Sequence, residues 1–143
     1  MKPLSRVLAL FPLAAAGSAI ACKCPQYSMA EEFSNATVAF VGSTAADPSQ
    51  PGKSGETIPF QVSRSLKGAP AAGATLAIDP FFETDCTAPF VPGAQLLVFA
   101  YANEKGAPVA NACSVRAAEP ISIGGRSEEP SPEVIKFLRS VPN

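Results

Sequence analysis

Residues 93–102 of the chain have the sequence GAQLLVFAYA. From Gln95 to Ala102 both alternating sets of side chains are mostly apolar, whereas a strand with one face in water alternates apolar and polar side chains. A short run that is apolar on both faces is typical of a strand covered on both sides. The sequence therefore predicts a central strand over Gln95–Ala102, which Gly93 opens.

Four further strands are predicted around this segment, because short runs with a period of two alternate with turn residues. They cover Thr37–Ser43, Thr57–Leu66, Ala74–Ile78 and Val109–Val115. The loop over residues 47–55 is rich in proline and glycine, and Asn103–Gly106 is a turn sequence. Five strands of this length favour a mainly β fold, a small closed or nearly closed barrel.

A short helix is expected at each end of the strand region. Ser28 with Glu31 three residues later is a capping box, a common start of a helix. Ser131-Pro132-Glu133 combines an N-cap, a proline at the first helical position and an acid near the positive end of the helix dipole. The residues expected to form the two apolar faces are Met29, Phe33 and Ala36 in the first helix, and Val134, Ile135, Leu138 and Val141 in the second.

The start of the chain has the features of a secretory leader. Lys2 and Arg6 give it a positive beginning, and Val7–Ala16 is an apolar stretch too short to span a bilayer. Ala19-Ile20-Ala21 then matches the small-x-small pattern of a cleavage site.

We therefore expect residues 1–21 to be removed on export and residues 22–143 to form one domain, secreted to the exterior or the periplasm. Without Lys2 and Arg6 this domain has nine basic and twelve acidic residues, which argues against nucleic acid or an anionic membrane as its partner. We expect a monomer. The alternative is a lipoprotein leader, in which Cys22 carries a lipid that attaches the domain to a membrane.

The chain contains no histidine, which excludes histidine-based nucleophilic triads, imidazole general bases and His-ligated zinc sites. Asp79, Glu83 and Asp85 lie in one irregular segment and can be considered as paired catalytic carboxylates. No nucleophile or base accompanies them, and exposed acids in loops are generally solvated. We therefore expect neither an enzyme nor a bound cofactor.

The four cysteines are an even number, which in an exported chain favours disulfides over zinc binding. An all-cysteine zinc site normally uses paired cysteines two residues apart, whereas one residue separates Cys22 from Cys24, and Cys86 and Cys113 are isolated. A Cys22–Cys24 bridge would close a strained ring. Two long-range pairings remain, and both tie the N-terminal end of the domain to its body, each bridge contributing about 4 kcal/mol in the chain-entropy model.

A C-x-C motif thus stands directly behind the leader and is followed by two single cysteines. The other notable segments are residues 36–42 (ATVAFVG), Phe60-Gln61-Val62, Leu66-Lys67-Gly68, residues 86–93 and residues 96–100 (LLVFA). In these segments, which cover most of residues 22–115, the chain resembles the netrin-like module of the tissue inhibitors of metalloproteinases, in the compact form found in bacterial sequences. The placement of the four cysteines is the most specific part of the resemblance.

The resemblance implies an OB fold, which is a five-stranded Greek-key barrel, and the disulfides Cys22–Cys86 and Cys24–Cys113. In that family the N-terminal amine and carbonyl of the processed chain chelate the active-site zinc of a metalloprotease and displace its catalytic water. By this resemblance Cys22 would bind the zinc of the target protease through its main-chain N and O, and the Lys23 side chain would enter the S1′ pocket. The protease-contacting segments beside them would be Cys24-Pro25 and Thr84-Asp85-Cys86-Thr87.

The resemblance therefore implies a secreted metalloprotease inhibitor-like protein whose partner is a zinc metalloprotease. Lys23 is charged where the animal inhibitors have a small or β-branched residue, so an acidic or open S1′ pocket would suit it. The alternative function is a secreted or lipid-anchored OB-fold module that binds a protein or glycan without inhibiting anything, because a fold alone does not determine function.

Overall fold

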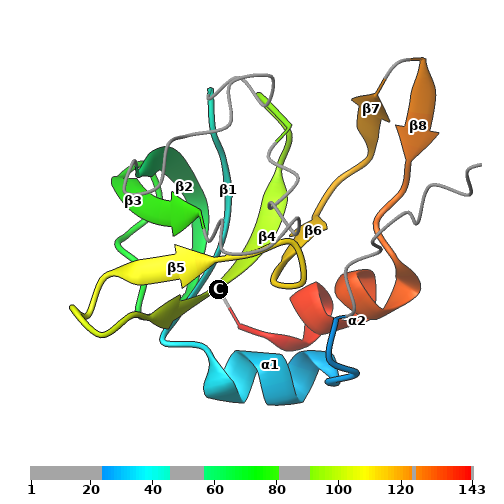
Figure 1. The fold of residues 1–143 in the computed structure, drawn as a ribbon. Helices are drawn as coiled ribbons and strands as arrows, with labels where there is room; N and C mark the ends of the chain where they lie inside the picture. Colours follow the sequence, from blue (N-terminus) through cyan, green and yellow to red (C-terminus); the bar gives the residue numbers. More distant parts are fainter. Residues whose placement is uncertain (1–23, 46–56, 81–90, 124, 143) are drawn as a thin grey trace, which may run out of the picture.

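The strand predicted over residues 95–102 is the one around which the sheet is arranged. The computed structural model describes residues 24–45, 57–80, 91–123 and 125–142. Within it, β4 (Leu96–Ala102) has β1 (Val38–Ser43) along one edge and shares its other edge between β5 (Pro108–Ala110) and β6 (Val115–Ala117) (Figure 1). All of these pairings are antiparallel.

The strands close into a barrel. β2 (Ile58–Lys67) pairs antiparallel with β1 and with β3 (Thr75–Pro80), and β3 pairs parallel with β5 through Asp79 and Val109. Because β5 and β1 both pair with β4, the order β1-β2-β3-β5-β4 returns to β1. This is the Greek-key barrel of the OB fold, and it confirms the expected fold class.

Side chains of β4 alternate between two apolar clusters. Leu96, Val98 and Ala100 belong to the barrel interior, whose other large members are Phe40, Phe60, Val62 and Ile78. Leu97 and Phe99 belong to a second cluster between the outer face of β1 and β4 and the two helices. All five of these β4 side chains are at most 2% exposed, which confirms that the strand is covered on both faces.

Both helices lie against the outer face of β1 and β4. α1 (Met29–Asn35) and α2 (Pro132–Ser140) meet there, and Phe137 of α2 contacts Phe33 of α1 and Phe99 of β4 edge to face, with ring centroids 5.4 and 5.7 Å apart (Figure 1). Both helices begin at the predicted N-caps. None of the helices in the described part of the chain is long and apolar enough to cross a membrane.

One prediction for the apolar face of α2 is wrong. Ile135 is 36% exposed, whereas Phe137 is buried. Positions three, four and seven residues after Val134 share its side of a helix, and these positions are Phe137, Leu138 and Val141. The helix therefore packs on the barrel with Phe137 in place of Ile135.

The fifth strand predicted over Val109–Val115 is divided in two. β5 ends at Ala110, β6 begins at Val115, and residues 111–114 between them form a turn. Asn111 and Ser114 cause this break, because their side chains bind backbone groups of the turn and so offer the backbone an alternative to the ladder. Cys113 therefore lies in a turn rather than in a strand.

A hairpin that the sequence analysis does not predict follows β6. β7 (Ile121–Ile123) pairs antiparallel with β8 (Arg126–Glu128), and the two strands project from the barrel (Figure 1). Its signal is the Gly-Gly pair at positions 124–125, directly after the alternating Ile121-Ser122-Ile123, because Gly-Gly is typical of a two-residue hairpin loop. Gly125 has a φ of 79°, the conformation for which such loops select glycine.

Two basic side chains of β2 bind the C-terminal ends of the helices. Lys67 Nζ donates to the two carbonyls of Phe33-Ser34 at 2.9 and 2.8 Å. The two terminal nitrogens of Arg64 donate to the carbonyls of Leu138 and Val141. The last carbonyls of a helix lack partners within it and form the negative end of its dipole, so a cation is favourable there. β2 thereby fixes both helices to the barrel.

Candidate functional site

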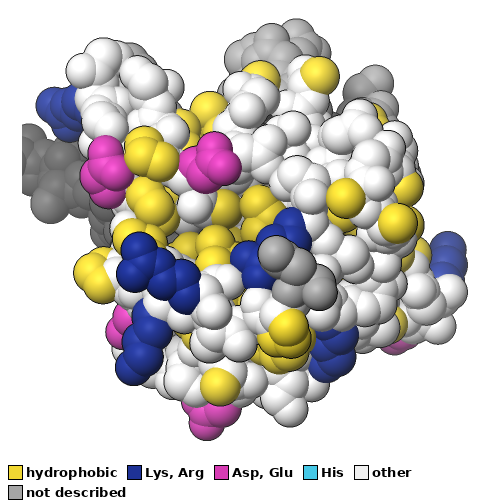
Figure 2. Space-filling view, turned by 180° about the vertical axis from the view of Figure 1, so that it is seen from behind, with side chains coloured by type: hydrophobic (Ala, Val, Ile, Leu, Met, Phe, Trp, Pro, Cys, Tyr) yellow, Lys and Arg dark blue, Asp and Glu magenta, His cyan; other side chains and the backbone are white. Residues whose placement is uncertain are grey.

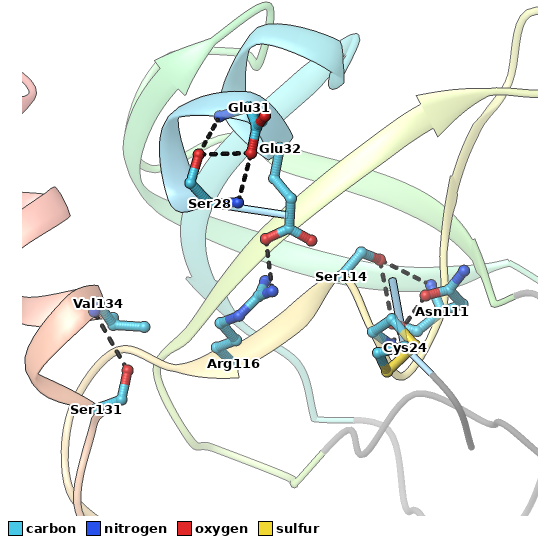
Figure 3. A network of polar contacts seen from close by, with 10 residues as sticks. Cys24, Ser28, Glu31, Glu32, Asn111, Ser114, Arg116, Ser131 and Val134 are labelled. Carbon is cyan, nitrogen blue, oxygen red and sulfur yellow. Dashed lines mark hydrogen bonds and ion pairs between the residues drawn. A yellow bond between two sulfur atoms is a disulfide. The ribbon is translucent and has the colours of Figure 1, made fainter. Parts of the chain in front are cut away.

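A disulfide joins the N-terminal segment to the barrel. Cys24 is bonded to Cys113 across 89 positions of sequence, with the two Cα atoms 5.3 Å apart. This bond confirms one of the two expected pairings. Cys24 and Pro25 are exposed and Cys113 is half-buried, so the bond holds an exposed segment against the turn between β5 and β6 (Figure 3).

The turn that carries Cys113 is held by its own polar groups. The Asn111 N–H donates to Ser114 Oγ, and the Cys113 N–H donates to Asn111 Oδ1, both at 2.9 Å (Figure 3). The Ser114 carbonyl accepts from the Phe99 N–H of β4 at 2.8 Å. Because Ser114 is also buried, the position of the disulfide is set by the barrel rather than by the N-terminal segment.

A buried ion pair provides a second link between the N-terminal segment and β6. Glu32 Oε2 of α1 lies 2.5 Å from Arg116 Nη2, and the two side chains are 6% and 28% exposed (Figure 3). The Arg116 guanidinium also lies over the Phe99 ring, 5.8 Å from its centroid. The disulfide and the ion pair therefore hold both ends of residues 24–32 against residues 113–116.

Between these two links the chain enters α1 through a complete capping box. Glu31 Oε2 accepts hydrogen bonds from the Ser28 N–H and from the Ser28 hydroxyl, both at 2.8 Å, and Ser28 Oγ accepts from the Glu31 N–H at 3.2 Å. The hydrogen bond from the Ser28 N–H lowers the pKa of Glu31 most, and the bond from the Ser28 hydroxyl lowers it further.

Tyr101 of β4 has a raised pKa. The main cause is its burial, and the negative charge of Glu32 is the next.

A groove of about 480 Å³ lies between residues 26–30 and α2. On the α2 side its lining residues are Glu133, Lys136, Phe137 and Ser140. Tyr27 lines the opposite side and is 55% exposed. The exposed Tyr27 ring is therefore only three positions along the chain from Cys24 of the disulfide, and it borders this groove.

The structure describes only part of the predicted protease-contacting site. Cys24 and Pro25 lie on the surface at the disulfide, as a contacting segment requires. The other predicted residues lie outside the described residues; they are Cys22, Lys23, Thr84, Asp85, Cys86 and Thr87. The predicted Cys22–Cys86 bridge lies outside them for the same reason.

The acids of the predicted irregular segment are likewise described only in part. Asp79 belongs to β3, where it pairs with Val109, while Glu83 and Asp85 lie outside the described residues. Within the described ranges there is no group of three or more His, Cys, Asp or Glu side chains that could hold a metal ion.

Neither Glu32 nor Arg116 is predicted as a site residue from the sequence, although Glu32 carries a recognisable signal. It stands three residues after Met29 and four before Ala36, on the helix face predicted to be apolar. A carboxylate on such a face needs a cationic partner, because an unpaired buried charge is very unfavourable. Arg116 carries no comparable signal, since a basic residue between Val115 and Ala117 is equally compatible with a solvent-facing strand position.

Comparisons of the chain with protein-family models, with curated proteins and with solved structures found no match.

Proposed function

We propose that the processed chain, beginning at Cys22, inhibits zinc metalloproteases through its N-terminal amine and carbonyl. The observation that supports this proposal is the attachment of exposed Cys24-Pro25 to the turn 111–114 by the Cys24–Cys113 bond. Two residues precede Cys24 in the processed chain, and two extended residues reach about 7 Å. A terminus on so short a tether loses little conformational freedom when it enters an active site, which favours binding.

The chemistry of the terminus suits a zinc ion. A free α-amine beside its own carbonyl is an N,O chelate, and nitrogen and oxygen are both ligands of zinc in proteins. The amine must be neutral to bind, and its ordinary pKa is about 7.7–8.0. Metal binding releases the proton, so inhibition should strengthen as the pH rises through this range and level off above it.

Lys23 determines which proteases the inhibitor would accept. Its side chain would enter the S1′ pocket, and an ammonium without a partner in an apolar pocket is strongly unfavourable. Proteases with an acidic or solvent-open pocket are therefore the expected targets. Lys23→Val should shift the preference toward proteases whose pocket is apolar.

The test is a panel of zinc proteases of secreted bacterial and matrix types, assayed with processed protein that has a free or an acetylated α-amine. We expect the free form to inhibit at least one protease, and both acetylation and an added alanine before Cys22 to abolish that inhibition. Glu104→Gln, a change in the exposed turn between β4 and β5, is the matched control and should leave inhibition unchanged. Identical behaviour of the free and blocked forms across the panel would contradict chelation and favour a binding module.

A further inference from the structure

β6 has an open edge in the described part of the chain, because it pairs with β4 on one side and no described strand lies on the other. The Ser114 carbonyl accepts from Phe99 N–H, and the Ala118 N–H donates to Gln95 O at 2.9 Å. In an antiparallel pair, residues that bond to the partner strand alternate with residues that do not. The backbone groups of Val115 therefore point away from β4, and those of Ala117 do so for the same reason.

A hollow of about 320 Å³ runs along this open edge. All three residues of β6 line it, and its apolar walls come from Val91, Leu96, Ile121 and Val134. Its volume is at the lower end of the range of about 300–1,000 Å³ that is usual for ligand pockets. A rear view of the molecule shows apolar side chains gathered in a hollow, with acidic side chains along its upper side (Figure 2).

The polar groups around the hollow favour a particular kind of occupant. Glu128 and Glu129 line it and are exposed, so a cation beside an apolar group would fit this rim. Arg116 lines it too, but its charge is paired with Glu32.

We propose that the open edge of β6 binds an extended peptide of another protein, in which apolar residues alternate with polar ones and a lysine or arginine lies at the end. The peptide adds a strand beside Val115–Ala117, as in other cases of β-strand addition. Its backbone bonds to Val115 and Ala117, its apolar side chains enter the hollow, and its basic side chain meets Glu128 and Glu129. This site is independent of the proposed inhibition by the N-terminus.

The probe for this proposal is a capped pentapeptide, lysine–valine–threonine–valine–lysine, titrated into the full processed protein and followed by amide NMR. We expect saturable shifts of the Val115 and Ala117 amides. Two further peptides are N-methylated, either at the threonine or at both valines. Because edge bonding alternates along an added strand, one methylated peptide should lose binding and the other should keep it. Loss in both or in neither would overturn strand addition.

Reversing the charge of Glu128 tests whether the acidic rim of the hollow binds the basic side chain of the peptide. Glu128→Lys should weaken binding of the lysine peptide by about two- to fivefold, which is the effect of one exposed ion pair. The same variant should bind a peptide with glutamates at both ends more tightly than the unchanged protein does. Glu104→Lys makes the same charge change at a distant turn and should alter neither affinity. Equal effects of Glu128→Lys and Glu104→Lys would overturn the assignment of the rim.

A second copy of the chain is the competing occupant of an open strand edge. Sedimentation of the protein without peptide distinguishes the two. A single species with the mass of one chain at all concentrations is the expected result. A concentration-dependent dimer whose formation shifts the Val115 and Ala117 amides would overturn the proposal and assign the edge to self-association.

Discussion

Glu32 of α1 and Arg116 of β6 form an ion pair whose carboxylate is 6% exposed, on a helix face that is otherwise apolar. The pair joins α1 to a strand that is distant in sequence, and the Arg116 guanidinium lies over Phe99, in the centre of the apolar cluster between helices and barrel. A charge in this position is stable only while its partner is present.

Removing one partner should therefore destabilise the fold more than removing both. Glu32→Leu and Arg116→Met should each lower the free energy of unfolding by about 1–3 kcal/mol, because each leaves a largely buried group without its charged partner. Combining Glu32→Leu with Arg116→Met replaces the pair by apolar groups and should recover much of that loss. Urea unfolding measures all three variants. A double variant whose loss equals the sum of the single losses would contradict the coupling.

The two apolar clusters should each be essential to stability. Phe60 lies in the barrel interior and Phe99 between β4 and the helices, and both are fully buried. Phe60→Ala and Phe99→Ala should each cost about 3–5 kcal/mol, which is a large part of the stability of about 5–15 kcal/mol that a domain of this size has. Ile135→Ala removes a partly exposed side chain of α2 and is the control, expected within about 0.5 kcal/mol.

Phe60 and Phe99 also show how far the sequence predicts the fold. Alternation alone places Phe60 on the inner face of β2, and the double-sided apolar run places Phe99 against a second layer. The barrel and both helix starts follow from such local patterns. Ala36, Ala39 and Leu97 complete the second cluster, but no local pattern shows that α1 and α2 meet there, because that contact depends on how the ends of the chain are arranged in space.

The candidate site is less predictable for a related reason. The pairing of Cys24 with Cys113 follows from a family resemblance, since spacing alone allows two long-range patterns. The division of the fifth strand depends on hydrogen bonds that Asn111 and Ser114 form within one turn. These local bonds compete with the strand pairing that the sequence pattern predicts.

Gly68 should be less replaceable than other glycines with positive φ. It has a φ of 61°, and a Cβ there would lie 2.5 Å from the Thr37 carbonyl oxygen, a backbone atom that cannot move aside easily. Gly106 has a φ of 78° but open space around it. Gly106→Ala should therefore cost about 1 kcal/mol for conformation alone, and Gly68→Ala about 1–3 kcal/mol more. Thermal and urea unfolding of the two variants compare them, and equal losses would contradict the close approach.

The capping box should make stability depend on pH. The pKa of Glu31 is lowered in the folded chain, so its contribution is complete above the pKa of an unfolded glutamate, about 4.3, and is lost as the pH falls through the lower folded value. Glu31→Gln keeps a capping side chain without the titration. Between about pH 5 and pH 3 the unchanged protein should lose more stability than Glu31→Gln does. Glu104→Gln, exposed in a turn, should behave like the unchanged protein.

The Cys24–Cys113 bond should stabilise the fold and hold the N-terminal segment in place. It closes a loop of 89 positions, which corresponds to about 4–5 kcal/mol in the chain-entropy model. Replacing both cysteines by serine should lower stability by up to this amount. Amide exchange should rise first in residues 24–35, while β4 stays protected, because the barrel interior does not depend on the bond. Equal loss of protection in α1 and β4 would contradict this local role.

Peptide mapping without reduction checks the bond itself. We expect a fragment in which Cys24 is joined to Cys113 and, by the family resemblance, a second in which Cys22 is joined to Cys86. The turn at residues 111–114 is held by hydrogen bonds of Asn111 and Ser114 in addition to the disulfide. Ser114→Ala should leave the pairing intact but loosen the turn, since the Asn111 N–H loses its acceptor. Recovery of Cys22 joined to Cys113 would overturn both the pairing and the placement of the processed N-terminus on which the inhibitor proposal depends.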